Sequence, residues 1–252
     1  MTSLREAIGI DLGGTNLRVA RVDQEGRVRA LRSERVASGR VPQLQRLHAL
    51  TRELAALDAT PGMVSGIGVG IAGRIRQKDG RVLSAGFLDL AGVPLRGIME
   101  DEHGVPVVVD NDAHMAMTAE MELGAATGCR DVVMFTIGTG IGGAVVTEGA
   151  IFYGHGIAGQ LGHLSVAASG PVCRCGRMGC VETYSSGAVL NAYMAEAGVG
   201  SGMNRKARYF LGFSSVEGLR ILTFRGLSSG FLGMVIFKTP FSCSAWIFSW
   251  ST

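Results

Sequence analysis

Three cysteines lie within eight residues of this 252-residue chain, in the spacing C-x-C-x4-C, and a histidine precedes them. The four residues are His163, Cys173, Cys175 and Cys180. Three thiolates and one imidazole nitrogen are a known closed, tetrahedral zinc set, and Gly176 and Gly179 allow the tight reversal that returns the last cysteine. The alternatives are three buried free cysteines or a redox pair, although the usual redox spacing C-x-x-C is absent. The segment therefore predicts a structural Zn²⁺ that organises a loop and does not activate water.

The interpretation of these cysteines depends on the compartment. The opening residues MTSLREAIGID lack the apolar stretch of a secretory signal, and no apolar run approaches the roughly 18 residues of a membrane helix. With 47% hydrophobic residues, the sequence predicts a globular, cytoplasmic protein, in which clustered cysteines are metal ligands or reactive thiols. Cys129 and Cys243 lie outside the pattern and are interpreted as ordinary residues.

The net charge of +3 comes from the end of the chain. Residues 201–252 contain six of the 24 Lys and Arg residues but only one acidic residue, Glu217, so residues 1–200 carry 18 basic and 20 acidic side chains. This balance predicts no nucleic-acid partner.

Hydrophobic patterning predicts an α/β architecture. Two β-rich runs around LGGTN predict a hairpin, a third run extends it, and leucines every three or four residues from Leu44 to Leu57 predict an amphipathic helix. A second hairpin is expected around GTGIGG, and the two hairpins suggest two lobes facing one ligand. The expected strands are Ile8–Asp11, Leu17–Val22, Val28–Val36, Gly66–Ala72, Val105–Asp110, Val132–Ile137 and Ala144–Thr147, and the further helices are Asn111–Leu123 and Ser185–Ala197.

The segment IDLGGTN is typical of a phosphate-binding turn. Gly13 and Gly14 allow close approach of a ligand and positive φ, the exposed N–H groups of such a turn can hold phosphate oxygens, and Thr15 adds a hydroxyl. Asp11 is a candidate ligand of Mg²⁺. The Walker A pattern is absent, and a plain β-turn is the alternative.

The second glycine-rich turn is weak evidence alone, but two opposed loops can grip a polyphosphate from two sides. Its candidate residues are Gly138, Thr139, Gly140, Gly142 and Gly143.

The segment VVVDNDAH places carboxylates between a buried strand and a helix. Asp112 can accept a proton from a substrate hydroxyl as general base, and Asn111 can hydrogen-bond a neighbouring hydroxyl. The alternative is that both residues only cap the helix, which is the commoner role of Asn and Asp. Asp110 is a competing candidate for the base.

Together these residues resemble the ROK family of bacterial sugar kinases and repressors. The matching segments cover about residues 7–190 and are IGIDLGGTNLRVA, VVVDNDAHMAMTAE, FTIGTGIGGAVV, the GH of GQLGHLSV, and GPVCRCGRMGCVETYSSG. The last of them looks most like the N-acetylmannosamine kinase and glucokinase branches. The resemblance implies the actin-like (ribonuclease H-like) two-lobe ATPase fold and transfer of the ATP γ-phosphoryl group to a hexose hydroxyl, usually O6.

The resemblance also implies residue roles. Asp112 would be the catalytic base and Asn111 would hold the sugar, while the two glycine-rich turns would bind ATP with Mg²⁺. His163 would place one nitrogen on zinc and the other toward the sugar, Glu182 would contact sugar hydroxyls, and Gly73 would line the sugar pocket. The family often dimerises, so a homodimer is an expectation.

Two features depart from the family pattern. Gln160 stands where the family usually has Glu, and Gln is a weaker acceptor that can also donate, so the identity of the hexose stays open. Residues 201–252 contain seven of the ten Phe, both Trp and no Asp, and they lack the family's adenosine motif and final helix. The sequence thus predicts a first lobe at 1–115, part of a second lobe at 116–200 and an atypical tail at 201–252. We interpret the tail as a frameshift product that leaves the fold incomplete at its C-terminal end, with a divergent but real ending as the alternative.

The leading functional hypothesis is an ATP-dependent hexose kinase. The alternative is a catalytically impaired sugar-binding pseudokinase or truncated remnant, which the tail and Gln160 would favour. A transcriptional regulator of the same family is the less favoured hypothesis, because the phosphate turn begins near residue 9 and no helix-turn-helix domain is expected before it.

Overall fold

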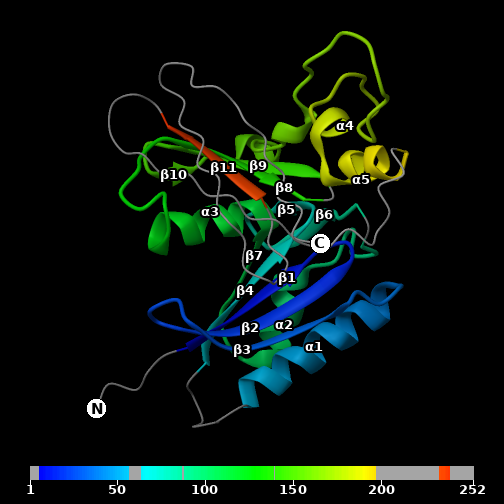
Figure 1. Ribbon diagram of the computed structural model, residues 1–252. Helices are drawn as coiled ribbons and strands as arrows, with labels where there is room; N and C mark the ends of the chain where they lie inside the picture. Colours follow the sequence, from blue (N-terminus) through cyan, green and yellow to red (C-terminus); the bar gives the residue numbers. More distant parts are fainter. Residues whose placement is uncertain (1–5, 57–63, 87, 139, 197–232, 239–252) are drawn as a thin grey trace. The chain divides into compact units, whose positions relative to one another are not determined.

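The computed structural model describes residues 6–56, 64–86, 88–138, 140–196 and 233–238. The chain divides into two compact units, Met1–Ala116 and Met117–Thr252 (Figure 1). The predicted tail lies outside the described residues except for one strand at 233–238, and Leu57, Ala197 and Cys243 also lie outside them. Within the described residues, no helix combines the length and the apolar character needed to cross a membrane.

The first unit is built on a five-stranded sheet with the order β3-β2-β1-β4-β7 (Figure 1). Strands β1, β2 and β3 form the predicted antiparallel meander, whereas β4 and β7 run parallel to β1. Its elements are β1 (Glu6–Leu12), β2 (Asn16–Asp23), β3 (Val28–Arg35), α1 (Arg40–Ala56), β4 (Val64–Ile71), β5 (Arg74–Arg76), β6 (Arg81–Ser84), α2 (Leu95–His103) and β7 (Val107–Asn111).

Alternating side chains of the sheet form the core of this unit. Every second residue of β1 and β2 is buried, and the inward residues of β4 and β7 join the same apolar cluster. Helix α1 packs against β1, β2 and β3, and it buries Leu47, Leu50 and Leu54 completely. Because their 3.6-residue spacing places these leucines on one face, the predicted amphipathic helix is confirmed over Arg40–Ala56.

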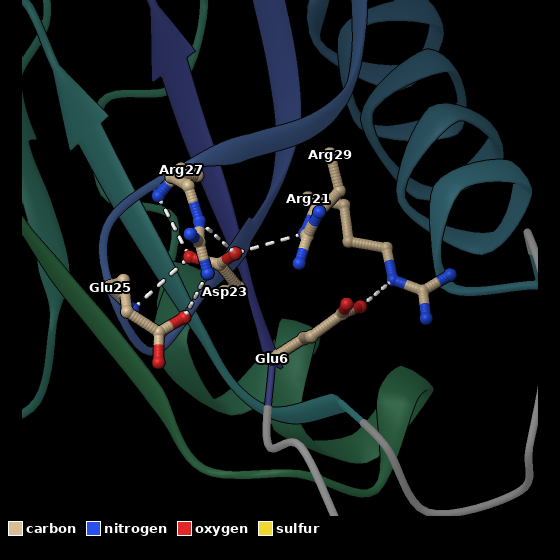
Figure 2. Close-up of polar contacts among 6 residues, drawn as sticks. All are labelled: Glu6, Arg21, Asp23, Glu25, Arg27 and Arg29. Atoms are coloured by element: carbon tan, nitrogen blue, oxygen red, sulfur yellow. Dashed lines mark hydrogen bonds and ion pairs between the residues drawn. The ribbon is translucent and has the colours of Figure 1, made fainter.

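The inward face of the sheet becomes charged where β2 turns into β3. The buried carboxylate of Asp23 accepts the backbone N–H groups of Glu25 at 3.1 Å and Arg27 at 2.9 Å, and it pairs with the guanidinium Nε atoms of Arg27 and Arg29, each at 2.9 Å (Figure 2). Burial alone would raise the pKa of Asp23, but the hydrogen bonds and charge of Arg27, with the charge of Arg29, outweigh it and hold the pKa below its usual value. Asp23 therefore stays ionised and fixes the β2–β3 turn.

A second ion pair lies on the same inward face. Arg21 of β2 contacts the carboxylate of Glu6 of β1, and both side chains are less than a tenth exposed (Figure 2). Arg21 is directly opposite Ile8 in the β1–β2 register. Removing one partner of such a pair leaves an uncompensated charge in an apolar surrounding.

We expect Arg21→Met to lower the free energy of unfolding by about 3 kcal/mol, because it leaves the Glu6 carboxylate buried without its guanidinium. The matched control is Arg32→Met, which removes an ion pair with Glu53 whose two side chains are both 44% exposed. This control should cost less than about 1 kcal/mol. Urea denaturation of both variants measures the difference, and equal losses would contradict a special role of the buried pair.

The second unit contains a four-stranded sheet with the order β10-β9-β8-β11. Strands β8 and β9 form the second predicted hairpin, and β11 pairs antiparallel with the other side of β8. Helix α3 begins in the first unit and ends in the second. The elements are α3 (Asp112–Leu123), β8 (Val132–Ile137), β9 (Ile141–Thr147), β10 (Ala150–Ile151), η1 (Gly154–Gly156), η2 (Leu161–His163), α4 (Glu182–Ser185), α5 (Gly187–Glu196) and β11 (Gly233–Lys238).

Two local predictions differ from the structure. The predicted helix Ser185–Ala197 is observed as α5 but begins two residues later, at Gly187, because Ser186 is extended with ψ of 159° and separates it from the short helix α4. Strand β9 begins at Ile141, three residues before the predicted start at Ala144, so part of the glycine-rich turn is strand. Helix α2 and the β5–β6 hairpin had no sequence prediction.

Candidate functional site

The junction of β7 and α3 carries two adjacent polar side chains, Asn111 and Asp112. Asn111 Nδ2 donates to the carbonyl oxygen of Gly73 at 2.9 Å, and Asn111 Oδ1 accepts the N–H of Ala113 at 2.9 Å. The second contact is typical of a helix N-cap. Asn111 therefore caps α3, and both ends of its amide group are fixed.

Asp112 is the first residue of α3 and is half-buried. Its Oδ1 also lies 2.9 Å from the N–H of Ala113. Burial raises the pKa of Asp112, and the negative charge of Asp11 raises it further. A carboxylate whose pKa is raised accepts a proton more readily, so its environment suits a general base.

Asp110, the competing candidate, has a different environment. Its side chain is buried, and its Oδ1 accepts the backbone N–H of Asn111 at 2.6 Å and Nε2 of Gln77 at 2.7 Å. The Nδ1 of His114 lies 3.1 Å from the same oxygen. Burial alone would raise the pKa of Asp110, but these hydrogen bonds and the charge of His114 hold it below its usual value. A buried carboxylate that is already engaged in this way is a poor proton acceptor.

Gly73 lies where two backbone segments approach closely. A Cβ added at Gly73 would be 2.2 Å from the carbonyl oxygen of Ser84, so a larger residue would force the backbone at Ser84 to shift. The carbonyl of Gly73 is thereby placed to receive the amide of Asn111. The structure thus brings two of the predicted sugar-binding residues, Gly73 and Asn111, into direct contact.

The first glycine-rich turn joins β1 to β2 in an antiparallel hairpin. The prediction of positive φ at Gly13 and Gly14 is wrong, because neither residue is among those with positive φ. The N–H of Gly13 donates to the carbonyl of Asn16 at 3.0 Å. Gly14 and Thr15 are exposed, and their N–H groups donate to none of the described residues. These two amides are therefore the ones that can receive phosphate oxygens.

Asp11 is the last carboxylate before this turn. Its Oδ2 accepts Nη1 of Arg18 at 2.8 Å, and its side chain is 47% exposed. The two residues are direct partners in the β1–β2 register. An accessible carboxylate next to an open turn is a donor that suits Mg²⁺, although Arg18 shares it here.

The second glycine-rich turn is tied internally. The N–H of Gly138 donates to the carbonyl of Gly140 at 2.9 Å, and the carbonyl of Gly138 accepts the N–H of Gly187 at 2.8 Å. Thr139 lies outside the described residues. The turn is thus fixed against the start of α5.

Close packing, and not positive φ, explains Gly140 and Gly143 in this turn. A Cβ at Gly143 would be 2.4 Å from the carbonyl oxygen of Met134, and one at Gly140 would be 2.5 Å from Oε2 of Glu182. Gly142 and Gly143 lie within β9. The same Oε2 of Glu182 accepts the N–H of Ile141 at 2.7 Å, so Glu182 supports the second turn directly.

The predicted zinc ligands come together. One ligand atom from each of His163, Cys173, Cys175 and Cys180 lies within 4.8 Å of all the others. Nδ1 of His163 lies 3.4 Å from Sγ of Cys173, and the Sγ atoms of Cys175 and Cys180 are 3.6 Å apart. The structure thus assembles a set of four donors that could hold a metal ion.

The loop around the cysteines has the turns that this assembly requires. Gly176 and Gly179 have φ of 88° and 73°, which confirms the predicted chain reversal. A backbone hydrogen bond from Arg177 is the main cause that lowers the pKa of Cys175 to about 7, whereas burial is the main cause that raises that of Cys180 to about 11. Nη2 of Arg177 also donates to the carbonyl of His163 at 2.6 Å.

Gln160 precedes the short helix η2, which ends at His163. Its side chain is exposed, and its backbone carbonyl accepts the N–H of His163 at 3.1 Å. Since Nδ1 of His163 faces Cys173, its Nε2 is the nitrogen on the other side of the ring. Gln160 and His163 thus lie at the two ends of η2, and Glu182 follows the last cysteine of the cluster by two residues.

Sequence reasoning missed several residues that contact the candidate residues, among them Arg18, Gln77, His114 and Arg177. Arg18 could have been found, because a hairpin closed at LGGTN places it opposite Asp11, and opposite charges pair across strands. No sequence pattern indicated the contacts of Gln77 and Arg177, because each lies in a loop and bonds to a residue distant in the sequence.

Comparison with known proteins identifies relatives over most of the chain. The ROK family matches residues 7–209. Glucokinase from Streptomyces coelicolor is 34% identical over 196 residues, which are 74% of this chain and 58% of that protein. N-acetylmannosamine kinase from Citrobacter koseri is 38% identical over 184 residues, which are 71% of this chain and 61% of that protein. The matched part of the chain thus spans about three fifths of the length of these relatives.

A solved structure gives the same result. The ROK family glucokinase from Streptomyces griseus, in complex with glucose and AMPPNP, matches with a TM-score of 0.67 and 33% identity. The match covers 76% of this chain and 60% of that one.

Proposed function

Because the chain belongs to the ROK family and has its actin-like α/β fold, we propose that it is an ATP-dependent hexose kinase. The reaction is transfer of the γ-phosphoryl group to a sugar hydroxyl, with O6 of glucose or of an N-acetylhexosamine as acceptor. The observation that carries the proposal is the half-buried carboxylate of Asp112, whose pKa is raised. It adjoins Asn111, whose amide is fixed at both ends.

In this proposal Asp112 takes the proton from the attacking hydroxyl. Asn111 hydrogen-bonds a neighbouring hydroxyl, and Gly73 lines the sugar pocket while its carbonyl holds the Asn111 amide. Phosphoryl transfer depends on positioning and on stabilisation of charge more than on covalent chemistry. A rigid Asn111 beside a basic Asp112 supplies the positioning and the proton acceptor.

The two glycine-rich turns would hold ATP and Mg²⁺. ATP supplies the phosphoryl group, and Mg²⁺ neutralises charge on the phosphates. The open N–H groups of Gly14 and Thr15 suit phosphate oxygens, and the accessible carboxylate of Asp11 suits Mg²⁺ directly or through water. The second turn, from Gly138 through Thr139 to Gly143, would also bind phosphate.

The metal held by the cysteine cluster would be a structural Zn²⁺. Zinc bonds of about 2.3 Å to sulfur and about 2.0 Å to nitrogen place tetrahedral ligand atoms roughly 3.8 Å apart for two sulfurs and roughly 3.5 Å apart for a nitrogen and a sulfur. The separation of 3.6 Å between the Sγ atoms of Cys175 and Cys180, and that of 3.4 Å between Nδ1 of His163 and Sγ of Cys173, are close to these spacings. Four protein ligands leave no open position on the ion. The residues then shape a sugar-binding loop, in which Nε2 of His163, Glu182 and Gln160 would face the sugar hydroxyls.

The reaction would take place in the cytoplasm, where reducing conditions keep thiols available as ligands. We propose a small-molecule sugar as the partner and no nucleic acid, because acidic side chains outnumber basic ones in residues 1–200. A sugar-binding pseudokinase is the alternative, and activity decides between the two.

We expect purified protein to release ADP from ATP and Mg²⁺ only when one of the hexoses glucose, N-acetylmannosamine, N-acetylglucosamine or fructose is present. The control without sugar should stay at background. Turnover with one of these sugars would support the kinase and name its substrate. Zinc-loaded protein that turns over none of them would contradict the kinase and favour the sugar-binding pseudokinase.

A further inference from the structure

Two buried side chains flank the candidate catalytic residues. Asp110 is the residue before Asn111, and His114 follows Asp112 by two positions. Each of the two is only 4% exposed. They belong to different elements, since Asp110 lies in β7 and His114 lies in the first turn of α3. The pair therefore brackets the residues that would act on the sugar.

The contact between them is directional. Nδ1 of His114 lies 3.1 Å from Oδ1 of Asp110. An ionised carboxylate can only accept hydrogen bonds, so Nδ1 of His114 carries the proton and donates. The pair joins the end of the strand to the start of the helix across the junction at Asn111 and Asp112.

The same oxygen of Asp110 gathers two further donors. It accepts the backbone N–H of Asn111 at 2.6 Å and Nε2 of Gln77 at 2.7 Å. Gln77 follows β5, in the segment that begins just after Gly73. Because the carbonyl of Gly73 receives the Asn111 side chain, the Asp110 contact and the Gly73 contact connect the same two segments of the fold.

This arrangement has a physical consequence for the junction. Rotation of the peptide before Asn111 would break its N–H bond to Asp110, and movement of the first turn of α3 would break the bond from His114. Buried hydrogen bonds that join two elements restrict the movement of one against the other. Asp110 and His114 thus restrict the two movements that would turn Asn111 and Asp112 away from a bound sugar.

We propose that Asp110 and His114 are positioning residues, a hydrogen-bonded pair that holds Asn111 and Asp112 in the orientation that phosphoryl transfer requires. The proposal rests on the proposed kinase function and on Asp112 as its base. Neither residue of the pair contacts the reacting atoms. Their effect passes through the backbone N–H of Asn111 and the first turn of α3.

Two substitutions of His114 separate positioning from packing. His114→Leu fills the space but removes the donor, whereas the amide nitrogen of His114→Asn can still donate to Asp110. We expect His114→Leu to lower kcat between about 10-fold and 100-fold, with KM changed less than about threefold, because small misplacements at a reacting centre have effects of this size. His114→Asn should stay within about threefold of the wild type in both parameters.

The matched control is Leu54→Ala, which removes a fully buried side chain from α1 in the same unit without touching the pair. It should destabilise the protein and leave kcat within about threefold. The proposal is overturned if His114→Leu keeps the wild-type kcat. It is also overturned if the kcat of His114→Asn or of Leu54→Ala falls as far as that of His114→Leu.

An NMR measurement tests the same inference without activity. We expect the backbone and side-chain amide signals of Asn111 to shift in His114→Leu and to stay near their wild-type positions in His114→Asn. Unchanged signals in His114→Leu would overturn the inference. A wild-type protein without turnover, or Asp112→Asn with full turnover, would instead contradict the proposed function, and the Asn111 signals alone would then decide whether the pair fixes the junction.

Discussion

Replacing Asp112 with Asn is expected to lower kcat for sugar phosphorylation by about 10³-fold, within the range that positioned general bases contribute. The amide has the shape of the carboxylate, and its oxygen can still accept the N–H of Ala113. It cannot accept the proton of the sugar hydroxyl at neutral pH. The loss should therefore fall on kcat, with KM changed little, because sugar contacts from Asn111 and the rest of the pocket remain.

The matched control is Asp131→Asn, the same chemical change at a carboxylate that accepts only the backbone N–H of Glu148 at 3.2 Å among the contacts described. It should leave kcat within about twofold. Coupled-enzyme measurement of ADP release gives both parameters for each variant. Asp112→Asn with more than a tenth of the wild-type kcat would remove Asp112 as the base.

The direction of the pKa shift at Asp112 adds a dependence on pH. A base works in its ionised form, so activity is present above its pKa and is lost as the pH falls through it. Burial and the charge of Asp11 raise the pKa of Asp112. The acidic limb of the kcat/KM profile should therefore lie at higher pH than it would for an ordinary Asp, and replacing Asp11 with Asn should move that limb to lower pH.

Much of the first unit could be predicted because its signals are local. Alternation on both sides of LGGTN specifies a hairpin, and the observed register from Glu6 opposite Asp23 to Leu12 opposite Leu17 follows from closing that turn. The leucine spacing likewise specifies α1. Helix α2 was missed because it buries only Leu95 and Met99, which is too few apolar positions for a period of 3.6 residues to be visible.

The candidate site shows the same limit. The cysteine spacing predicted the four-ligand cluster, since the glycines that close the loop are adjacent in sequence to the ligands. The environment of the carboxylates could not be predicted in this way. Asp110 and Asp112 are two residues apart, and their pKa values move in opposite directions. Hydrogen bonds from His114, Asn111 and Gln77 and the charge of His114 outweigh burial at Asp110, whereas burial and then the charge of Asp11 raise the pKa of Asp112. Only the folded structure distinguishes Asp112, the proposed base, from Asp110, the proposed positioning residue.

The glycines of the two turns illustrate a further limit. Sequence reasoning assigned positive φ to Gly13 and Gly14, and neither has it. A glycine can equally be required by close approach, as at Gly143, where a Cβ would collide with the carbonyl of Met134. The letter G does not distinguish the two causes, because the approaching backbone belongs to another strand.

Replacing Cys175 with Ser is expected to remove most of the bound zinc and to lower the free energy of unfolding by about 4 kcal/mol, a fraction of the roughly 10–16 kcal/mol that structural zinc provides to zinc-finger peptides. A hydroxyl does not replace a thiolate on zinc, and the other three ligands would then hold the ion weakly. Cys175 is a suitable choice because it is exposed, so the substitution leaves the apolar core intact. Loss of the Cys175 thiolate should therefore destabilise the protein because the metal is lost, and not because packing is disturbed.

The metal content and the stability should change together. Elemental analysis measures zinc per chain, and urea denaturation with and without a chelator measures how much stability the metal supplies. The chelator should destabilise the wild type and the control Cys129→Ser, which changes a cysteine outside the cluster, but it should have little further effect on Cys175→Ser. Cys175→Ser with full zinc content would contradict the ligand assignment. A wild type whose free energy of unfolding does not change with the chelator would favour three free cysteines, because removing metal cannot destabilise thiols that hold none.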